Sequence, residues 1–115
     1  MKILTTGTAG FIGSAFVRQA AKRGIKLVVV DCLDYAADML RIQEAKPDFT
    51  FYKADIRDAR KILAVFKKEK PQAVVNFAAQ SHVDRSIKDP AIFIDTNIRG
   101  VQSLLDAGRA AGIEK

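Results

Sequence analysis

Three glycines near the start of the chain, Gly7, Gly10 and Gly13, are spaced Gly-x-x-Gly-x-x-Gly. They separate an apolar stretch at residues 2–5 from residues 11–22, where apolar side chains recur at helical spacing. A strand, turn and helix in this order present free backbone N–H groups and the positive end of a helix dipole to an anion, and the missing Cβ lets a phosphate approach. The motif therefore predicts a site for the diphosphate of a dinucleotide, although a purely structural turn would give the same spacing.

An acidic residue stands where the ribose of such a dinucleotide would lie. Gly24 ends the first predicted helix, residues 25–30 read as a second buried strand, and Asp31 follows. Its separation from the glycines is close to the roughly 20 residues at which an acid meets the ribose hydroxyls. A carboxylate accepts from a free 2′-hydroxyl and repels a 2′-phosphate, so Asp31 favours NAD over NADP. The alternative is an aspartate that ends the strand as a turn former.

The composition indicates one small domain. The 115 residues are 49% hydrophobic, which suffices for one modest core, so we expect a single dinucleotide-binding domain over residues 1–115. No apolar run reaches membrane-spanning length, and we expect neither a signal peptide nor a membrane partner. Cys32 is the only cysteine. No internal disulfide is then possible, which fits a cytoplasmic location and a bystander thiol.

The net charge of +6 raises the question of nucleic-acid binding. The basic residues are scattered among acidic ones, and the one cluster, Lys67, Lys68 and Lys70, closes a predicted helix, where cations complement the dipole. Aromatic and basic residues do not interleave as a stacking platform requires. We therefore expect no nucleic-acid partner, and we expect no metal site.

The remaining chain keeps alternating between helix and strand patterns. Strands that alternate with helices pair in parallel through right-handed crossovers, which predicts a doubly wound α/β fold of the Rossmann type with strand order 3-2-1-4. The chain ends where a fifth strand would begin. We expect a helix at residues 35–45, a strand at 48–53, a helix capped by Asp58 and ending at 68, a strand at 73–79 and, after a polar loop, a helix at 91–110.

The strand order predicts where a ligand would bind. The connections leaving strands 1 and 4 run in opposite directions, and the crevice at such a switch point lies over their carboxyl ends, at residues 7–13 and 77–82. The second segment contains His82, the only histidine. A substrate role and a solvated loop histidine both fit this position.

Five runs of the sequence carry a resemblance to a known family: TTGTAGFIGSAFVR, VVVDCLDYA, YKADIRD, VVNFAAQSHVDRSI and FIDTNIRGVQSLLDA. Over nearly its whole length the chain resembles the N-terminal half of the extended short-chain dehydrogenases/reductases, most closely the dTDP-glucose 4,6-dehydratases. The segment HVDRSI narrows the resemblance to dehydratases of sugar nucleotides. The resemblance implies NAD as cofactor and a nucleotide sugar as substrate.

The same resemblance implies roles for individual residues. Ser81 and His82 would border the sugar. Cys32 and Asp34 lie on the adenosine side, where the family commonly has lysine and threonine, and Gln80 replaces a common glutamate. Beyond the three glycines, the cofactor would contact Phe11 and Ile12 at the pyrophosphate, Asp31 at the ribose, Asp55 and Ile56 at the adenine, Phe77, Ala78, Ala79 and Ser81 on the nicotinamide side, and Thr96.

Simpler roles fit several of these residues. Asp55 could be a strand-end turn former, Ser81 a cap or turn residue, and Asp84 with Arg85 an ordinary loop ion pair. Thr96 and Asn97 fall within a predicted helix, where packing or solvent exposure would also explain them.

The hydride chemistry of the family uses a Tyr-x-x-x-Lys pair, whose lysine lowers the pKa of the tyrosine so that the phenolate takes the sugar hydroxyl proton. In this sequence Met39 stands four residues after Tyr35, and Ile56 four residues after Tyr52. We therefore expect NAD binding without sugar turnover. The alternative is a non-catalytic folding or assembly unit in which the glycine motif is vestigial.

A homodimer is the expected assembly. The strand at residues 73–77 would present an unpaired edge, and the helix at residues 91–110 carries more apolar surface than one small sheet covers. The family resemblance also places this helix at a dimer interface. A monomer remains the alternative if the helix shields the edge.

Overall fold

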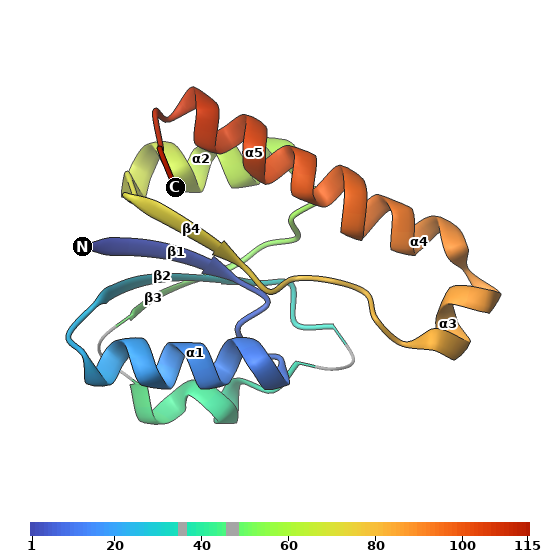
Figure 1. The fold of residues 1–115 in the computed structure, drawn as a ribbon, viewed down its shortest axis with the longest axis horizontal. Coiled ribbons are helices and arrows are strands. Elements are labelled where there is room, and N and C mark those ends of the chain that lie inside the picture. The colour runs from blue at the N-terminus through green and yellow to red at the C-terminus, as the bar shows by residue number, and fades with distance from the viewer. Residues whose placement is uncertain (35–36, 46–48) are drawn as a thin grey trace.

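The computed structural model describes residues 1–34, 37–45 and 49–115. Its centre is a parallel sheet of four strands in the order β3-β2-β1-β4 (Figure 1). Thr6 of β1 pairs with Val30 of β2 and Asn76 of β4, so the carboxyl ends of these strands meet at one edge. The predicted α/β fold and strand order are confirmed. The strands are β1 (Lys2–Thr6), β2 (Lys26–Asp31), β3 (Phe49–Lys53) and β4 (Ala73–Asn76).

Helices cover both faces of this sheet (Figure 1). The helix α1 (Phe11–Lys22) and the 3₁₀ helix η1 (Met39–Ala45) lie on one face, while α2 (Ala59–Glu69) and α5 (Val101–Ala110) lie on the other. Successive strand side chains alternate between the two faces, so the central strands are buried on both. Fully buried side chains fill the space between the sheet and the helices on both faces. They include Val17, Val29 and Ile42 on the face of α1 and η1, and Leu4, Ile62 and Phe66 on the face of α2 and α5.

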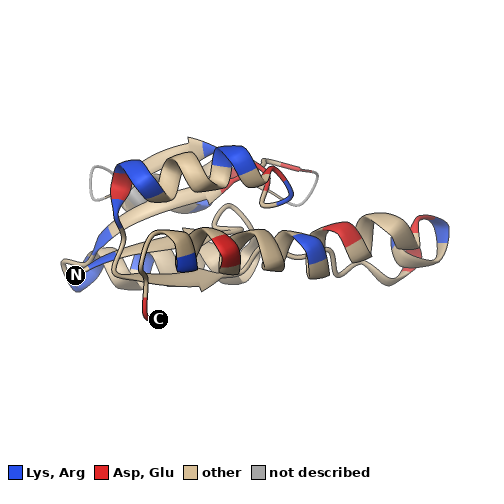
Figure 2. Ribbon diagram, turned by 90° about the horizontal axis from the view of Figure 1, so that it is seen from above, with Lys and Arg blue, Asp and Glu red and all other residues tan. Residues whose placement is uncertain are grey.

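A continuous helical rod follows β4 and projects past the end of α2 (Figures 1 and 2). It consists of α4 (Pro90–Ile94), the π-helical segment η2 (Asp95–Gly100) and α5. The Asp89 carboxylate caps the rod, because it accepts from the Ile92 N–H at 3.4 Å, and Pro90 occupies the first turn, where its missing N–H costs nothing. The helix predicted at residues 91–110 is confirmed, and its π turn was not foreseen.

Three predicted segments need correction. The polar loop expected before the rod contains a short helix, α3 (Val83–Lys88). None of its side chains is buried, and its two apolar residues, Val83 and Ile87, are too few to indicate a helix. The helix expected at residues 35–45 is a 3₁₀ helix that begins at Met39, and residues 35 and 36 lie outside the described residues, as does residue 48 of the third predicted strand. The strand expected at residues 73–79 ends at Asn76, because its partner β1 ends at Thr6.

The outer edge of β4 is not entirely unpaired, contrary to expectation. The Val74 N–H donates to the carbonyl of Lys115, the last residue, at 2.9 Å. This places the end of the chain beside β4, on the side away from β1. The strand itself is half-buried along Ala73–Val75, as an edge strand covered by helices on its two faces would be.

Candidate functional site

The loop between β1 and α1 is packed so tightly that two of its glycines cannot be replaced without movement. Gly7 has a φ of +64°, and a Cβ on it would lie 2.4 Å from the Ala78 nitrogen. A Cβ on Gly13 would lie 2.3 Å from the Gly7 carbonyl oxygen. At Gly10, however, the nearest atom to an added Cβ is 3.2 Å away. The protein itself therefore requires glycine at positions 7 and 13, whereas a Cβ at Gly10 would meet a single atom, the Gly7 carbonyl oxygen, in a contact that a shift of a few tenths of an ångström would relieve.

Asp31 connects this glycine loop to the segment that follows β2. Its side chain accepts from the backbone N–H of Ala9 and from that of Leu33, each at 2.8 Å, and the residue is only 6% exposed. A second bond joins the glycine loop to β2: the Gly7 N–H donates to the Val30 carbonyl at 3.0 Å. The turn-forming role considered for Asp31 is thus present. Each carboxylate oxygen retains a further lone pair, so a ribose hydroxyl remains a possible additional donor.

The loop after β4 is fixed from two directions. The Thr6 hydroxyl donates to Asn76 Oδ1. The Ala78 N–H donates to both of these oxygen atoms, at 3.3 Å to Thr6 Oγ1 and 3.2 Å to Asn76 Oδ1. Two residues on, the Gln80 N–H donates to Asn97 Oδ1, and Asn97 Nδ2 donates to the Gln80 carbonyl, both at 2.8 Å. The π-helical segment η2 thereby holds the backbone of the β4 loop.

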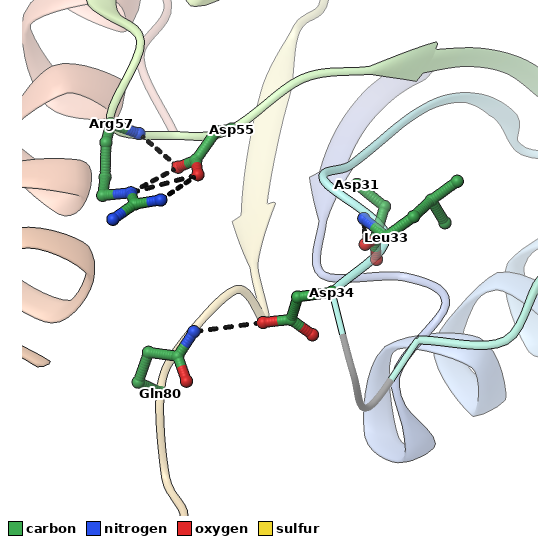
Figure 3. Close-up of polar contacts among 6 residues, drawn as sticks. All are labelled: Asp31, Leu33, Asp34, Asp55, Arg57 and Gln80. Atoms are coloured by element: carbon green, nitrogen blue, oxygen red, sulfur yellow. Dashed lines mark hydrogen bonds and ion pairs between the residues drawn. The ribbon is translucent and has the colours of Figure 1, made fainter. Parts of the chain in front are cut away.

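Beyond β3, Asp55 forms a tight pair with Arg57 (Figure 3). Arg57 Nη2 donates to Asp55 Oδ2 at 2.7 Å, Arg57 Nε lies 3.0 Å from both carboxylate oxygens, and the Arg57 backbone N–H donates to Oδ1 at 2.9 Å. These bonds lower the pKa of Asp55 below its ordinary value, against the opposing effect of burial. Asp58 caps α2 by accepting from the Lys61 N–H at 3.2 Å, as predicted.

The thiol of Cys32 sits among carboxylates. Burial, followed by the charges of Asp34, Asp55 and Asp31, raises its pKa above the ordinary value. Because the thiolate is the reactive form, this cysteine is a weak nucleophile at neutral pH. The interpretation of Cys32 as a bystander is consistent with this environment.

These features surround one cavity of about 420 Å³ over the carboxyl ends of the strands. Its walls come from the glycine loop, the segments after β2, β3 and β4, and the helical rod. Eleven residues predicted to contact a cofactor lie on these walls: Gly7, Gly10, Asp31, Cys32, Asp34, Asp55, Ile56, Phe77, Ala78, Ala79 and Thr96.

Five other predicted site residues do not line the cavity. Phe11 and Ile12 lie at the start of α1 and are 84% and 68% exposed, and Gly13 is buried beneath the loop. Ser81 and His82 are exposed, one to two residues beyond the cavity wall at Gln80. The ligand contacts assigned to all sixteen positions remain predictions.

Several residues of the site were not predicted. Arg41 fixes the glycine loop by donating to the Ala9 carbonyl at 3.0 Å, and Asn97 holds Gln80. The pattern DIR after β3 was the available signal for Arg57, since a residue two positions after an aspartate can donate to it. The cavity is also lined by Val30, Ala37, Ala54, Arg57, Gln80, Arg85 and Ile92.

The described part of the chain contains neither a cluster of metal ligands nor a membrane-spanning helix. No group of three or more histidine, cysteine, aspartate or glutamate residues there is arranged to hold a metal ion. No helix in the described ranges is long and apolar enough to cross a membrane.

The chain is similar to several known proteins. It is 47% identical over 108 residues to the dTDP-glucose 4,6-dehydratase of Xanthomonas campestris, a match that covers 92% of this chain and 31% of that protein. It is likewise 47% identical over 112 residues to dTDP-glucose 4,6-dehydratase 1 of Escherichia coli K12, covering 95% of this chain and 31% of the relative. The chain thus spans about a third of the length of these curated relatives.

Solved structures show the same fold at similar coverage. DesIV, a dTDP-glucose 4,6-dehydratase from Streptomyces venezuelae crystallised with NAD, superposes with a TM-score of 0.88 at 40% identity over 98% of this chain and 37% of that one. The UDP-glucose 4-epimerase of Thermus thermophilus, also with NAD, gives 0.87 at 35% identity over 99% of this chain and 35% of the epimerase. The model of the GDP-mannose 4,6 dehydratase family matches residues 4–115, and the chain belongs to this family.

Proposed function

We propose that this chain binds NAD and forms the dinucleotide-binding part of a sugar-nucleotide 4,6-dehydratase, most similar to those acting on dTDP-glucose. The observation that carries the proposal is the cavity over the carboxyl ends of β1, β2 and β4, which joins the glycine loop to Asp31 at a switch point of the sheet. The NAD-containing structures of DesIV and of the Thermus epimerase support it.

The geometry supports one orientation of the dinucleotide. The diphosphate would lie over Gly10, where no Cβ stands in its way, and against the first turn of α1, whose N-cap provides no side-chain acceptor. The adenosine would extend toward Asp31 and the Asp55–Arg57 pair. The nicotinamide would extend toward residues 77–79 and Thr96, with Ser81 and His82 at the outer end, where a sugar would approach.

NAD would bind more tightly than NADP, because a 2′-phosphate would meet the carboxylates of Asp31, Asp34 and Asp55. Calorimetric titration of the chain with NAD and with NADP tests this. The variant Asp84→Asn, which removes one carboxylate charge from exposed α3, is the control. We expect NADP to bind at least tenfold more weakly than NAD. This corresponds to a difference of about 1.4 kcal/mol in binding free energy. Equal affinities, or no heat with either dinucleotide, would contradict the proposal.

Bound NAD would supply a hydride acceptor at the nicotinamide ring, but the sequence contains no Tyr-x-x-x-Lys pair to take up the hydroxyl proton. We therefore propose that residues 1–115 bind the cofactor as a single domain and do not convert dTDP-glucose by themselves. Incubation of the pure chain with NAD and dTDP-glucose should yield no 4-keto-6-deoxy sugar nucleotide. Its formation would show that another base performs this step, and His82, the only histidine of the sequence, would be the first candidate.

A homodimer and a cytoplasmic location complete the proposal. The helix α3 and the rod carry five large apolar side chains that are 52% to 77% exposed: those of Val83, Ile87, Ile94, Ile98 and Leu105. This exposed apolar surface also favours the second candidate function, a self-associating unit, because large exposed apolar surfaces are typical of interfaces. Sedimentation at several concentrations should show a dimer that Leu105→Lys weakens and Ala110→Lys, an exposed control on α5, does not. A monomer at every concentration would contradict it.

A further inference from the structure

The amino ends of the strands, opposite the cavity, gather exposed lysine and arginine side chains (Figures 1 and 2). The helices α1, α2 and α5 run back along the sheet, so their last turns lie at the same end of the molecule as the starts of β1 and β2 (Figure 1). Each of these helices ends in basic residues, and both strands begin with a lysine. Six exposed cations define this basic end surface: Lys22, Arg23, Lys26, Lys67, Lys70 and Arg109.

The cations of the basic end surface are not neutralised by the protein. Among the described residues, none of the six forms an ion pair, and the pair at this end joins Lys2 Nζ to Glu69 Oε2 at 3.4 Å. At the carboxyl ends of the strands, by contrast, arginine pairs with carboxylate, as Arg57 does with Asp55 at 2.7 Å. The unpaired positive charge therefore faces away from the cavity.

Helix dipoles account for only part of this charge. A cation in the last turn of a helix is favourable, which explains a basic residue at each helix end. It does not explain Lys2 and Lys26, which are partners across β1 and β2, because like charges on neighbouring strands repel. Asp106 and Glu114 flank Arg109 in the sequence, so the positive charge is densest at the ends of α1 and α2. An anionic surface lying against this end would relieve the repulsion.

The arrangement of the cations indicates the shape of the partner. They come from α1 on one face of the sheet, from the sheet itself, and from α2 and α5 on the other face (Figure 1). A broad, flat partner can contact all three layers together, whereas an extended peptide would follow one of them. Met1 adds an apolar side chain that is 71% exposed, and its carbonyl accepts from the Lys26 N–H at 3.2 Å. We propose that the basic end surface docks on an anionic lipid bilayer.

Docking in this orientation leaves the cavity open to solution, because the cavity lies over the opposite ends of the strands. The expectation of no membrane partner considered apolar spans alone, and binding to lipid headgroups requires none. Each lysine or arginine near an anionic leaflet contributes about a fivefold gain in affinity. The inference does not depend on the proposed dinucleotide function.

Cosedimentation with vesicles measures the docking. The chain should bind vesicles of phosphatidylcholine mixed with phosphatidylserine in about 0.1 M salt, and should not bind phosphatidylcholine alone. Salt at about 1 M, where the Debye length is about 3 Å, should release it. The double variant Lys22→Glu/Lys67→Glu should bind at least about tenfold more weakly, because it replaces two cations with two anions.

A second double variant, Arg60→Glu/Lys88→Glu, is the matched control. It changes the net charge equally, but its exposed residues lie in the first turn of α2 and on α3, away from the basic end surface. Its vesicle binding should fall less than about threefold, because charges beyond a Debye length of the bilayer are screened. Both double variants should keep the wild-type midpoint in urea denaturation and the wild-type affinity for NAD.

Three outcomes would overturn the inference. The first is no binding to phosphatidylserine vesicles in about 0.1 M salt. The second is equal weakening by the two double variants, which would assign the binding to net charge rather than to this surface. The third is tighter binding to duplex DNA than to the vesicles, lost in Lys22→Glu/Lys67→Glu, which would assign the surface to nucleic acid. Failure of NAD to bind, with vesicle binding intact, would instead contradict the proposed function alone.

Discussion

Asp31 ends β2 and Asp55 follows the neighbouring parallel strand β3, and both were predicted to contact adenosine, yet they are built into the site differently. Asp31 is 6% exposed and accepts from two backbone N–H groups, one of them in the glycine loop. Asp55 keeps 29% of its side chain exposed, and among the described residues its carboxylate bonds to Arg57 alone, two residues away. The first carboxylate shapes the loop that a ligand would touch. The second is a local pair whose loss would leave the fold intact.

The rigidity of the loop held by Asp31 is best tested at Gly13. An alanine Cβ would meet the Gly7 oxygen at 2.3 Å and the Thr8 Cα at 2.9 Å, both of which belong to backbone that cannot rotate away. Gly13→Ala should therefore lower the free energy of unfolding by at least about 3 kcal/mol. Gly10→Ala, with its nearest contact at 3.2 Å, should cost less than about 1 kcal/mol in urea denaturation. Similar costs for the two would show that the loop relaxes freely.

The scaffold role of Asp31 predicts the next largest effect. Asp31→Ala leaves the N–H groups of Ala9 and Leu33 without their acceptor, and the Ala9–Asp31 bond is buried. The free energy of unfolding should fall by about 2 kcal/mol, the cost of one unsatisfied buried donor. The measurement is urea denaturation without ligand, with Asp34→Ala as the exposed comparison. An unchanged midpoint would mean that Asp31 serves a ligand only.

The pair at Asp55 should contribute less and depend on pH. Since Arg57 lowers the folded pKa of Asp55, its contribution is present above the unfolded pKa, near 3.9, and is lost as the pH falls through the lower folded pKa. Asp55→Asn should cost less than about 1 kcal/mol at pH 7, because the pair is partly solvated, and less at pH 2 than at pH 7. A cost equal at both pH values would assign the effect to the turn geometry instead.

The smallest effect concerns the thiol of Cys32, whose pKa the charges of Asp31 and Asp55 both raise. Because its pKa is raised, Cys32 should react with iodoacetamide more slowly at pH 7 than free cysteine does. The two reaction rates should converge as the pH rises. Asp55→Asn should accelerate the reaction at pH 7, because it removes one of the charges that raise the pKa. A rate equal to that of free cysteine at pH 7 would contradict the environment described for Cys32.

Local sequence patterns were sufficient for most of the scaffold. Alternating apolar runs and helical periodicity gave four strands and the helices α1, α2 and the rod, and Asp58 before a helix was enough to predict its cap. The predicted strand boundaries were wrong where a neighbouring strand decides them. The strand β4 ends at Asn76 because its partner β1 ends at Thr6. The short helix α3 was not predicted, because two apolar residues, Val83 and Ile87, are too short a periodic signal.

The sequence by itself determined that Gly7, Gly10, Gly13 and Asp31 gather at the carboxyl ends of parallel strands, because glycine placement and strand alternation depend on neighbours along the chain. Only the tertiary structure decided what each side chain bonds to there. Asp31 reaches Ala9 across 22 residues, Gln80 reaches Asp34 across 46, and Asn97 reaches Gln80 across 17. Such contacts depend on how separate loops converge when the sheet forms, and a few tenths of an ångström decide whether a polar group finds a partner, which no periodicity records.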